Sequence, residues 1–467
     1  MRIGFQSVFI ILFSIILPLS FVNGQPLQVS KNNRYLVKSD GSPFFWLADT
    51  AWELFHRCNR EEATMYLKKR KSQGFNVIQA VVLAELDGLH TPNPYGDLPL
   101  INDDPTKPNP DYFSHVDFIL DEAARLGMYI ALLPTWGDKV FTNSWGKGPE
   151  IFNVTNARVY GLWLGERYRD RDNIIWIIGG DRTPRENSRD VEVWRSMADG
   201  IVEGCGGYEN TLMSFHPQPR DFGGSSTWFH EDEWLDFNMH QTGHCPKPSY
   251  LNIRHDYQLT PVKPVLDGEP FYEDHPVCFN AKEGGYSLPR DIRRIMYWNV
   301  FAGAFGQTYG CHDIWQMHIQ GENGINNPLR PWQKALDLPM ASQVHHLKDL
   351  MLSRPFLSRI PDQSMVVTPQ QDDEDYVIAT RDQQGTYAMI YFPTGKSVDL
   401  DLNSLNGKNL ITWWFDPRTG ASFRGEDLKK NGSVHHIEPP TRGVGQDWVL
   451  VLDARKSDFP KPGQVIY

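Results

Sequence analysis

Between about residues 43 and 350, apolar positions follow two patterns that alternate along the chain. Short continuous apolar runs are typical of strands buried on both faces, and they occur near 43–48, 77–82, 128–133, 174–178, 211–215, 235–239, 264–268 and 306–309. Segments with helical apolar spacing follow them, near 59–74, 116–126, 156–169, 191–201 and 288–302, and a long amphipathic segment covers about 330–353. Eight such repeats predict an α/β fold, a (β/α)8 TIM barrel.

A doubly wound sheet would also alternate strands and helices. The chain contains no G-x-G-x-x-G or Walker motif of the kind that such sheets often carry for their cofactors. The barrel is therefore the preferred prediction.

The pattern changes near residue 360, where apolar and polar residues alternate with a period of two. Val398, Leu400 and Leu402 show it, and strand-like runs near 387–392, 410–415 and 448–452 are separated by turn-rich spacers such as 382–385. This predicts a C-terminal all-β sandwich over 358–467, after a barrel domain over 25–357 that begins with a short β segment near 27–37.

The first 24 residues read as a signal peptide. Arg2 is the only charged residue before Lys31, and the apolar stretch from Val8 to Leu19 is too short for a membrane span. With cleavage before Gln25, we expect an exported protein, periplasmic or extracellular, without a membrane span.

Composition narrows the classes of function. The 467 residues carry a formal charge of −11, with 40% apolar and 22% charged residues, which indicates a globular protein with a large core. The absence of a basic stripe argues against a nucleic-acid partner. The 15 Trp, 18 Tyr and 25 Phe residues suit stacking on sugar rings, and they also suit the core of a large barrel.

Neither the cysteines nor any metal-binding or nucleophile motif indicates a particular chemistry. Five Cys residues lie far apart, so one disulfide is possible, with at least one free thiol and no preferred pair. The sequence lacks H-x-H, H-E-x-x-H and G-x-S-x-G. We therefore expect no cofactor and no metal.

Reactive groups in a barrel lie at the carboxyl ends of its strands. Two carboxylic acids stand out there: Asp181 ends WIIGGD (176–181), and Glu269 ends the run VLDGE (265–269). They follow strands four and seven, across the barrel mouth, where they could flank a sugar as the acid and the second carboxylate of glycoside hydrolysis. Glu273 is the rival for the second role, and an acid at a strand end can instead cap a helix or pair with Arg.

Other residues at or near strand ends are candidates for substrate binding. Each also has a structural alternative: Asp49 as a helix cap, the tryptophans as core and the histidines as buried structural groups. The set is Asp49, Trp52, Trp136, His216, His240, Gln241 and Tyr309.

Five segments together carry a family resemblance: DGSPFFWLADTAW (40–52), GFNVIQ (74–79), WIIGGDRTP (176–184), DGEPFYE (267–273) and WFDPRTG (414–420). They resemble the apiosidase-like glycoside hydrolases, glycoside hydrolase family 140, with a C-terminal domain of the type described as collagen-binding. The resemblance covers nearly the whole chain after the signal peptide.

The resemblance implies cleavage of plant pectin, at the bond from apiose to the galacturonan backbone of rhamnogalacturonan II. It also implies Asp181 as acid/base and Glu269 as nucleophile. A retaining mechanism needs carboxyl groups roughly 5–5.5 Å apart, inversion roughly 6.5–9.5 Å, and the acid should have a raised pKa.

Three other readings of the sequence stay open. One is a glycosidase for another furanosyl or deoxy-sugar linkage. A second is a non-catalytic carbohydrate- or matrix-binding protein, and a third is a collagen-directed protease, for which the chain shows no catalytic constellation. The sequence does not indicate an oligomeric state.

Overall fold

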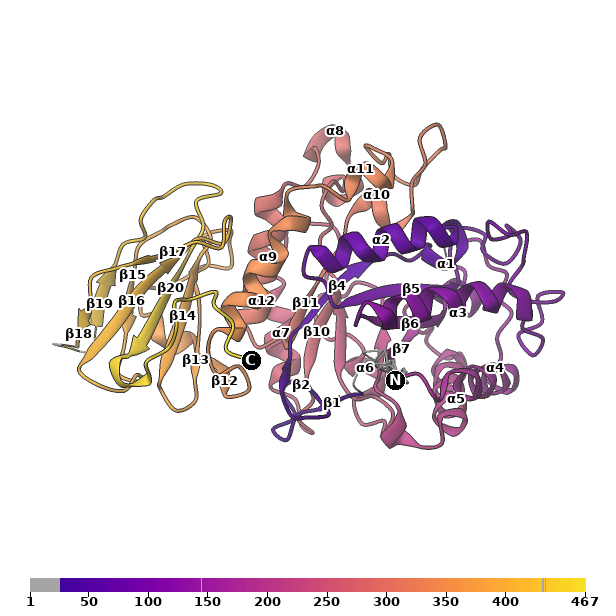
Figure 1. Ribbon diagram of the computed structural model, residues 1–467, viewed down its shortest axis with the longest axis horizontal. Helices are drawn as coiled ribbons and strands as arrows, with labels where there is room; N and C mark the ends of the chain where they lie inside the picture. The colour runs from indigo at the N-terminus through magenta and orange to yellow at the C-terminus, as the bar shows by residue number, and fades with distance from the viewer. Residues whose placement is uncertain (1–25, 144, 431, 433) are drawn as a thin grey trace, which may run out of the picture.

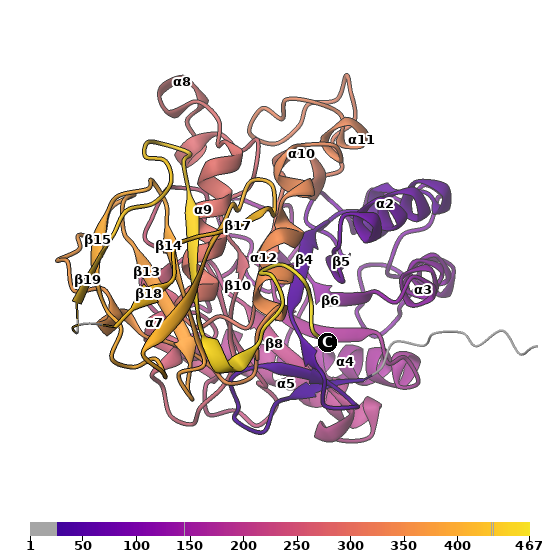
Figure 2. The ribbon, with the colours of Figure 1, turned by 60° about the vertical axis from the view of Figure 1, so that its left-hand side comes forward.

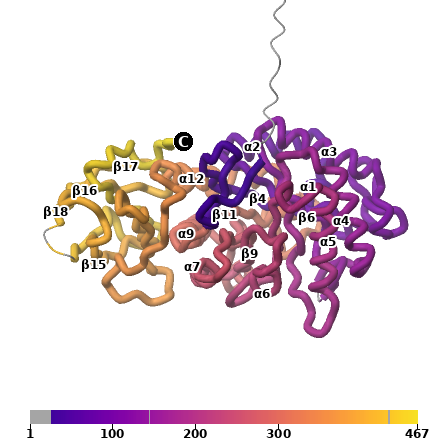
Figure 3. The backbone as a smooth tube through the Cα atoms, turned by 90° about the horizontal axis from the view of Figure 1, so that it is seen from below, coloured from indigo at the N-terminus to yellow at the C-terminus, as the bar shows by residue number. Residues whose placement is uncertain are grey.

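The computed structural model describes residues 26–143, 145–430, 432 and 434–467. The expected signal peptide, residues 1–24, lies outside the described residues. Two bodies lie side by side along the long axis of the molecule, a helix-rich barrel and a smaller all-β domain (Figures 1 and 3).

Parallel strands form the barrel. In the described part of the chain there are eight of them: β4 (Trp46–Thr50), β5 (Val77–Leu83), β6 (Tyr129–Thr135), β7 (Ile174–Gly179), β8 (Met213–His216), β9 (Asn238–Gln241), β10 (Val265–Glu269) and β11 (Gly306–Tyr309). Strands β4 to β8 pair in order, β9 pairs with β10, and β11 pairs with β4. Two gaps remain, between β8 and β9 and between β10 and β11. Backbone hydrogen bonds close them, from the Asp236 N–H to the Met213 carbonyl (2.9 Å) and from the Phe305 N–H to the Val265 carbonyl (3.2 Å). The predicted barrel is confirmed.

Helices surround the strands (Figure 2). The longer ones are α2 (Arg60–Ser72), α3 (Pro110–Arg125), α4 (Val154–Tyr168), α5 (Asp190–Cys205), α7 (Tyr250–Tyr257), α9 (Pro289–Phe301) and α12 (Val344–Leu352), and the short ones are α1 (Leu54–Arg57), α6 (Ser226–Phe229), α8 (Ala281–Gly284), α10 (His312–Trp315) and α11 (Trp332–Ala335). The predicted start of α2 is seen in detail, because Asn59 and Glu62 form a capping box.

Two predicted elements are divided in the structure. The run 43–48 splits at Phe45: β3 (Pro43–Phe44) pairs with β2 (Leu36–Lys38) in an N-terminal sheet with β1 (Leu27–Val29), and only β4 joins the barrel. The segment 330–353 breaks into α11, a 3-10 turn (Met340–Ser342) and α12. Pro339 stands at the first break, directly before the 3-10 turn, where its ring and missing N–H prevent a continuous helix.

The C-terminal domain is a two-sheet β structure, as predicted. Its larger sheet holds β12 (Arg359–Pro361), β13 (Ile378–Asp382), β14 (Tyr387–Phe392), β16 (Asn409–Phe415), β17 (Ser422–Arg424), β18 (Leu428–Lys429) and β20 (Trp448–Ala454), and its smaller sheet pairs β15 (Val398–Asp401) with β19 (Val434–Ile437). Alternate residues of β14 face opposite ways. Ile390 and Phe392 belong to the core between the sheets, whereas Met389 and Tyr391 belong to the barrel core.

The two bodies share a buried interface along α9 and α12 (Figure 1). The ring of Tyr391 stacks on that of Tyr297 at 4.8 Å, and the Arg293 guanidinium pairs with the Asp447 carboxylate at 2.7 Å. Buried ion pairs and shared aromatic packing fix the β domain to the barrel.

Candidate active site

A cavity of about 620 Å³ lies at the carboxyl ends of the barrel strands. Its size suits a small-molecule or oligosaccharide ligand. The walls come from barrel residues: Trp52, Glu85, Leu86, Trp136, Trp145, Gly146, Lys147, Asp181, Gln218, Pro219, Gln241, His244, Glu269, Tyr272, His275, Phe279, Trp315, Ile325 and Asn326. Aromatic rings and a few polar groups thus share one concave surface.

Asp181 reaches this cavity because the chain turns sharply after β7. Gly179 and Gly180 have φ values of +92° and +133°, and Asp181 itself lies in the left-handed region at +49°. A Cβ on Gly180 would lie 2.9 Å from the amide nitrogen of Gly137, so the close strand approach also requires glycine. The Asp181 side chain is 15% exposed and accepts a 3.0 Å hydrogen bond from Trp145 Nε1.

Glu269 enters the cavity from the last position of β10. The register shifts between Asp267 and Glu269, which is the mark of a bulge. Two imidazoles flank the carboxylate, with His216 Nε2 3.1 Å from Oε2 and His244 Nε2 3.3 Å from Oε1. Glu269 is therefore a buried carboxylate between two nitrogen donors.

The tautomer of His216 follows from its other contact. Its Nδ1 accepts a hydrogen bond of 3.3 Å from the backbone N–H of Asp181. In a neutral imidazole only the other nitrogen then carries a proton, so the protonated Nε2 is the nitrogen that lies 3.1 Å from Glu269 Oε2. One ring thus connects the backbone of one carboxylic acid to the side chain of the other.

The two carboxyl groups differ in their electrostatics. Burial, and secondarily the negative charge of Glu269, raise the pKa of Asp181 to about 6 against the opposing effect of Arg182. Burial would also raise the pKa of Glu269, but the imidazoles of His216 and His244 prevail and lower it to about 2. The pair therefore holds one acid that retains a proton to mildly acidic pH and one ionised carboxylate, the division that acid–base chemistry at two carboxyls requires.

Three of the predicted substrate-binding residues line the cavity: Trp52, Trp136 and Gln241. The two indole rings contact each other at 5.1 Å and pack against His216. His216 itself is fully buried behind them, so it touches Glu269 and does not line the wall.

The remaining three candidates, Asp49, Tyr309 and His240, lie elsewhere, as does the rival Glu273. Asp49 is fully buried, and its Oδ2 accepts hydrogen bonds from Tyr66 (2.5 Å) and Arg70 Nε (2.6 Å). Tyr309 donates to Glu273 at 2.7 Å. These groups are hydrogen-bonded inside the protein and are not among the residues that line the cavity, which fits the structural alternative.

His240 is also held by protein groups. Its Nε2 lies 3.1 Å from the buried carboxylate of Asp256, which belongs to the last turn of α7. Like Asp49, it does not line the cavity.

Several wall residues were missed at the sequence level, among them Glu85, Trp145, Gln218, His244 and Tyr272. They lie in loops, two to ten residues beyond the strand that precedes them. No local pattern marks them, because only the folded path of each loop decides which side chain turns inward. Glu85 and His244 follow β5 and β9 closely, and their position just past a strand end was the available signal.

Among the described residues, no group of three or more His, Cys, Asp or Glu side chains is arranged to hold a metal ion. In the same residues, no helix has the length and apolar character needed to cross a bilayer.

Comparison with known proteins gives the family. The family model described as "Apiosidase-like, catalytic domain" matches residues 30–358, and the one described as "Putative collagen-binding domain of a collagenase" matches residues 360–453. A crystal structure of a glycoside hydrolase family 5 protein from Bacteroides vulgatus ATCC 8482 is 34% identical, with a TM-score of 0.84 over 93% of this chain and 94% of that chain.

A second solved structure, named only as a glycoside hydrolase, is also 34% identical with a TM-score of 0.84, over 93% of this chain and 98% of that one. No curated protein sequence matches the chain. A family model that spans most of the chain, together with relatives that share both bodies, shows that this chain belongs to the apiosidase-like glycoside hydrolases.

Proposed function

We propose that the protein is an exported glycosidase that cleaves the bond from apiose to the galacturonan backbone in rhamnogalacturonan II of plant pectin. Asp181 acts as the acid/base and Glu269 as the nucleophile. The observation that carries these roles is that both carboxyl groups line one cavity in different surroundings, since two imidazoles lie against Glu269 and lower its pKa, whereas burial raises the pKa of Asp181.

In the first step the protonated Asp181 gives its proton to the glycosidic oxygen as the bond from that oxygen to the anomeric carbon breaks. Glu269 attacks the same carbon from the other face and forms a glycosyl ester. In the second step Asp181, now ionised, takes a proton from water, the water oxygen replaces Glu269 on the anomeric carbon, and both carboxyl groups return to their starting states.

The low pKa of Glu269 supports retention. A general base works best when its pKa lies near the operating pH. A carboxylate with a pKa of about 2 is a weak base toward water but a good leaving group from a glycosyl ester. The donors His216 and His244 suit that second role, because they stabilise the negative charge that returns to Glu269 when the ester is hydrolysed.

The walls of the cavity support a sugar ligand. The rings of Trp52, Trp136 and Trp145 offer flat apolar faces to the C–H side of a sugar, while Gln241 presents an amide oxygen that has no partner within the protein. The choice of apiose and of pectin rests on the family to which the chain belongs.

Export is supported by the one disulfide among the described residues, Cys245–Cys278. Disulfides persist in oxidising compartments outside the cytosol. The bridge and the predicted signal peptide agree on an exported protein, periplasmic or extracellular.

The test incubates the wild type and the Glu269→Gln variant with rhamnogalacturonan II and resolves the products by chromatography. We expect apiose-terminated side chains from the wild type alone. A folded wild type that releases nothing contradicts the substrate, and a Glu269→Gln variant with full activity contradicts the nucleophile.

Product stereochemistry tests the mechanism. Proton NMR during the first minutes of hydrolysis should show the anomer of the substrate, as retention requires. The opposite anomer would make Glu269 a base.

A further inference from the structure

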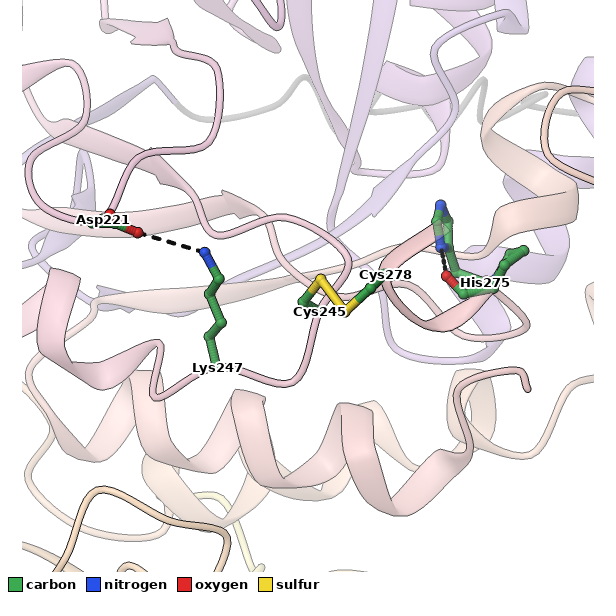
Figure 4. The surroundings of a disulfide bond; sticks show 6 residues. Asp221, Cys245, Lys247, His275 and Cys278 are labelled. Atoms are coloured by element: carbon green, nitrogen blue, oxygen red, sulfur yellow. Dashed lines mark hydrogen bonds and ion pairs between the residues drawn. A yellow bond between two sulfur atoms is a disulfide. The ribbon is translucent and has the colours of Figure 1, made fainter. Parts of the chain in front are cut away.

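The two loops that follow β9 and β10 are joined by a covalent bridge beside the cavity. Cys245 lies in the first loop and Cys278 in the second, 33 residues apart, and their sulfur atoms are bonded (Figure 4). Cys245 directly follows His244, and the backbone N–H of Cys278 donates a 2.9 Å hydrogen bond to the carbonyl oxygen of His244. The bridge and this hydrogen bond therefore hold His244 from two sides.

The imidazole of His244 has a tightly defined place. It stacks on His275 at 4.1 Å between ring centroids, contacts Tyr272 at 4.4 Å, and directs Nε2 to within 3.3 Å of Glu269 Oε1. Only 8% of the residue is exposed. A small displacement of the loop would move this nitrogen away from the carboxylate.

The second loop has a backbone that needs support. Cys278 and Phe279 both lie in the left-handed region, with φ of +51° and +62°. Residues other than glycine keep such conformations only where the surrounding structure imposes them. Phe279 lines the cavity, and its ring centroid lies 5.5 Å from that of His244 in an edge-to-face contact. The bridge therefore supports a wall of the cavity as well as the contact between His244 and Glu269.

We propose that the Cys245–Cys278 bridge is a functional part of the active site, because it positions the His244 imidazole on Glu269. His244 is a positioning residue for the nucleophile, and the enzyme retains its activity on the acid limb of its pH profile only with the bridge oxidised. The proposal rests on the role assigned to Glu269 above.

The size of the change in the Glu269 pKa depends on the groups that face its carboxylate. They are His216 from the end of β8, His244 from the loop after β9, Tyr272 from its own loop and Asp181 from the end of β7. His216 remains when the bridge is lost, so Glu269 should lose one of its two imidazole donors and keep the other.

Titration of the Glu269 carboxyl tests the proposal without any substrate. Protein labelled with 13C at the Glu carboxyl is titrated by NMR, and the Glu269→Gln variant identifies the signal. We expect His244→Ala to move the midpoint upward by roughly one pH unit, the scale of one lost hydrogen-bonding partner. The Cys245→Ser/Cys278→Ser variant should move it in the same direction, and His244→Gln, which retains a donor, should move it less than His244→Ala.

A variant cycle separates positioning from general stabilisation of the fold. If the bridge acts through His244, the triple variant titrates like His244→Ala alone, because the shared contact is lost only once. Additive shifts, or an unchanged midpoint in the bridge-less protein, overturn the proposal. Should the serine variant fail to fold, mild reduction of the folded wild type gives the same comparison.

Lys247 supplies a matched control two residues from Cys245. Its ammonium pairs with Asp221 at 3.5 Å across the same loop region, on the exposed side (Figure 4). Lys247→Met should leave the Glu269 midpoint unchanged, since exposed pairs of this kind contribute little. A shift as large as that of the bridge variant would show a general loop effect and contradict the proposal.

The activity assay keeps the two proposals distinct. On rhamnogalacturonan II, the bridge variant and His244→Ala should lose roughly tenfold in kcat/KM at the acid limb, where Glu269 becomes protonated. A wild type that is inactive on this substrate refutes the substrate alone, because the titration still reports on the bridge. Full activity of Glu269→Gln refutes the nucleophile and removes the basis of this inference.

Discussion

The Asp181 and Glu269 pair and the Asp49 and Glu273 pair lie at the same end of the barrel, and their surroundings differ. Asp49 and Glu273 accept hydrogen bonds from Tyr66, Arg70, Tyr309 and the backbone of Met340, with 0–1% exposure. Asp181 and Glu269 face a cavity and are held by Trp145, His216 and His244.

The contrast shows what marks a reactive carboxyl group in this barrel. Burial does not mark it, because Glu269 is buried as Asp49 and Glu273 are, and neither does a position near a strand end, because Asp49 and Glu269 share it. The difference is oxygen atoms that reach open space, together with neighbours that set the two pKa values apart.

The strongest test of the contrast is Asp181→Asn. We expect kcat to fall by roughly 10²–10⁴, the contribution typical of a positioned general acid. The fold should persist. Burial raises the pKa of Asp181 to about 6, so the ionised carboxylate destabilises the folded state above that pH, and the neutral Asn side chain avoids this cost. Chromatographic rates and circular dichroism check both statements, and near-wild-type turnover would remove Asp181 from the mechanism.

Asp49→Asn should give the opposite outcome. It leaves the fully buried Arg70 guanidinium without its carboxylate, which costs about 3–5 kcal/mol of unfolding free energy for a buried pair. Urea denaturation measures the loss. Turnover of the folded fraction should stay within about twofold of wild type, and a much larger loss would mean that the Asp49 cluster shapes the cavity.

Sequence patterns predicted the barrel well because continuous apolar runs and helical spacing are local properties. They placed Asp181 and Glu269 at strand ends for the same reason. They also placed Asp49 and Tyr309 among the substrate-binding candidates, because the partner that neutralises Asp49, Arg70, lies 21 residues further on and meets it only when α2 packs against β4.

The loop residues show what sequence patterns could not predict. His244 and Trp145 touch the two carboxyl groups, yet their contacts depend on how long loops return to the barrel mouth. The pairing of Cys245 with Cys278 could not be predicted for the same reason. Both residues lie in such loops, and five cysteines left several pairings open.

The pH profile offers a finer comparison of the two carboxyl groups. Because Asp181 must hold its proton, kcat/KM should fall as pH rises through about 6. In Glu269→Gln the negative charge next to Asp181 is gone, so the pKa of Asp181 should fall, while burial still holds it above the ordinary value of 3.8. NMR titration of Asp carboxyls measures this shift, and an unchanged midpoint would mean that the two groups do not interact.

The smallest expected effect concerns Trp145, whose Nε1–H donates to Asp181 Oδ2 and stabilises the ionised form. Trp145→Phe keeps an aromatic ring at the wall and removes this donor, so the pKa of Asp181 should rise and the falling limb of kcat/KM should move to higher pH. Tyr309→Phe is the matched control, because it also removes one donor from a buried carboxyl group, Glu273. It should cost about 1–3 kcal/mol of unfolding free energy and leave the limb in place. If both variants moved the falling limb of kcat/KM equally, loss of any nearby hydrogen-bond donor would disturb Asp181. The distinction between a reactive carboxyl pair and a structural one would then fail.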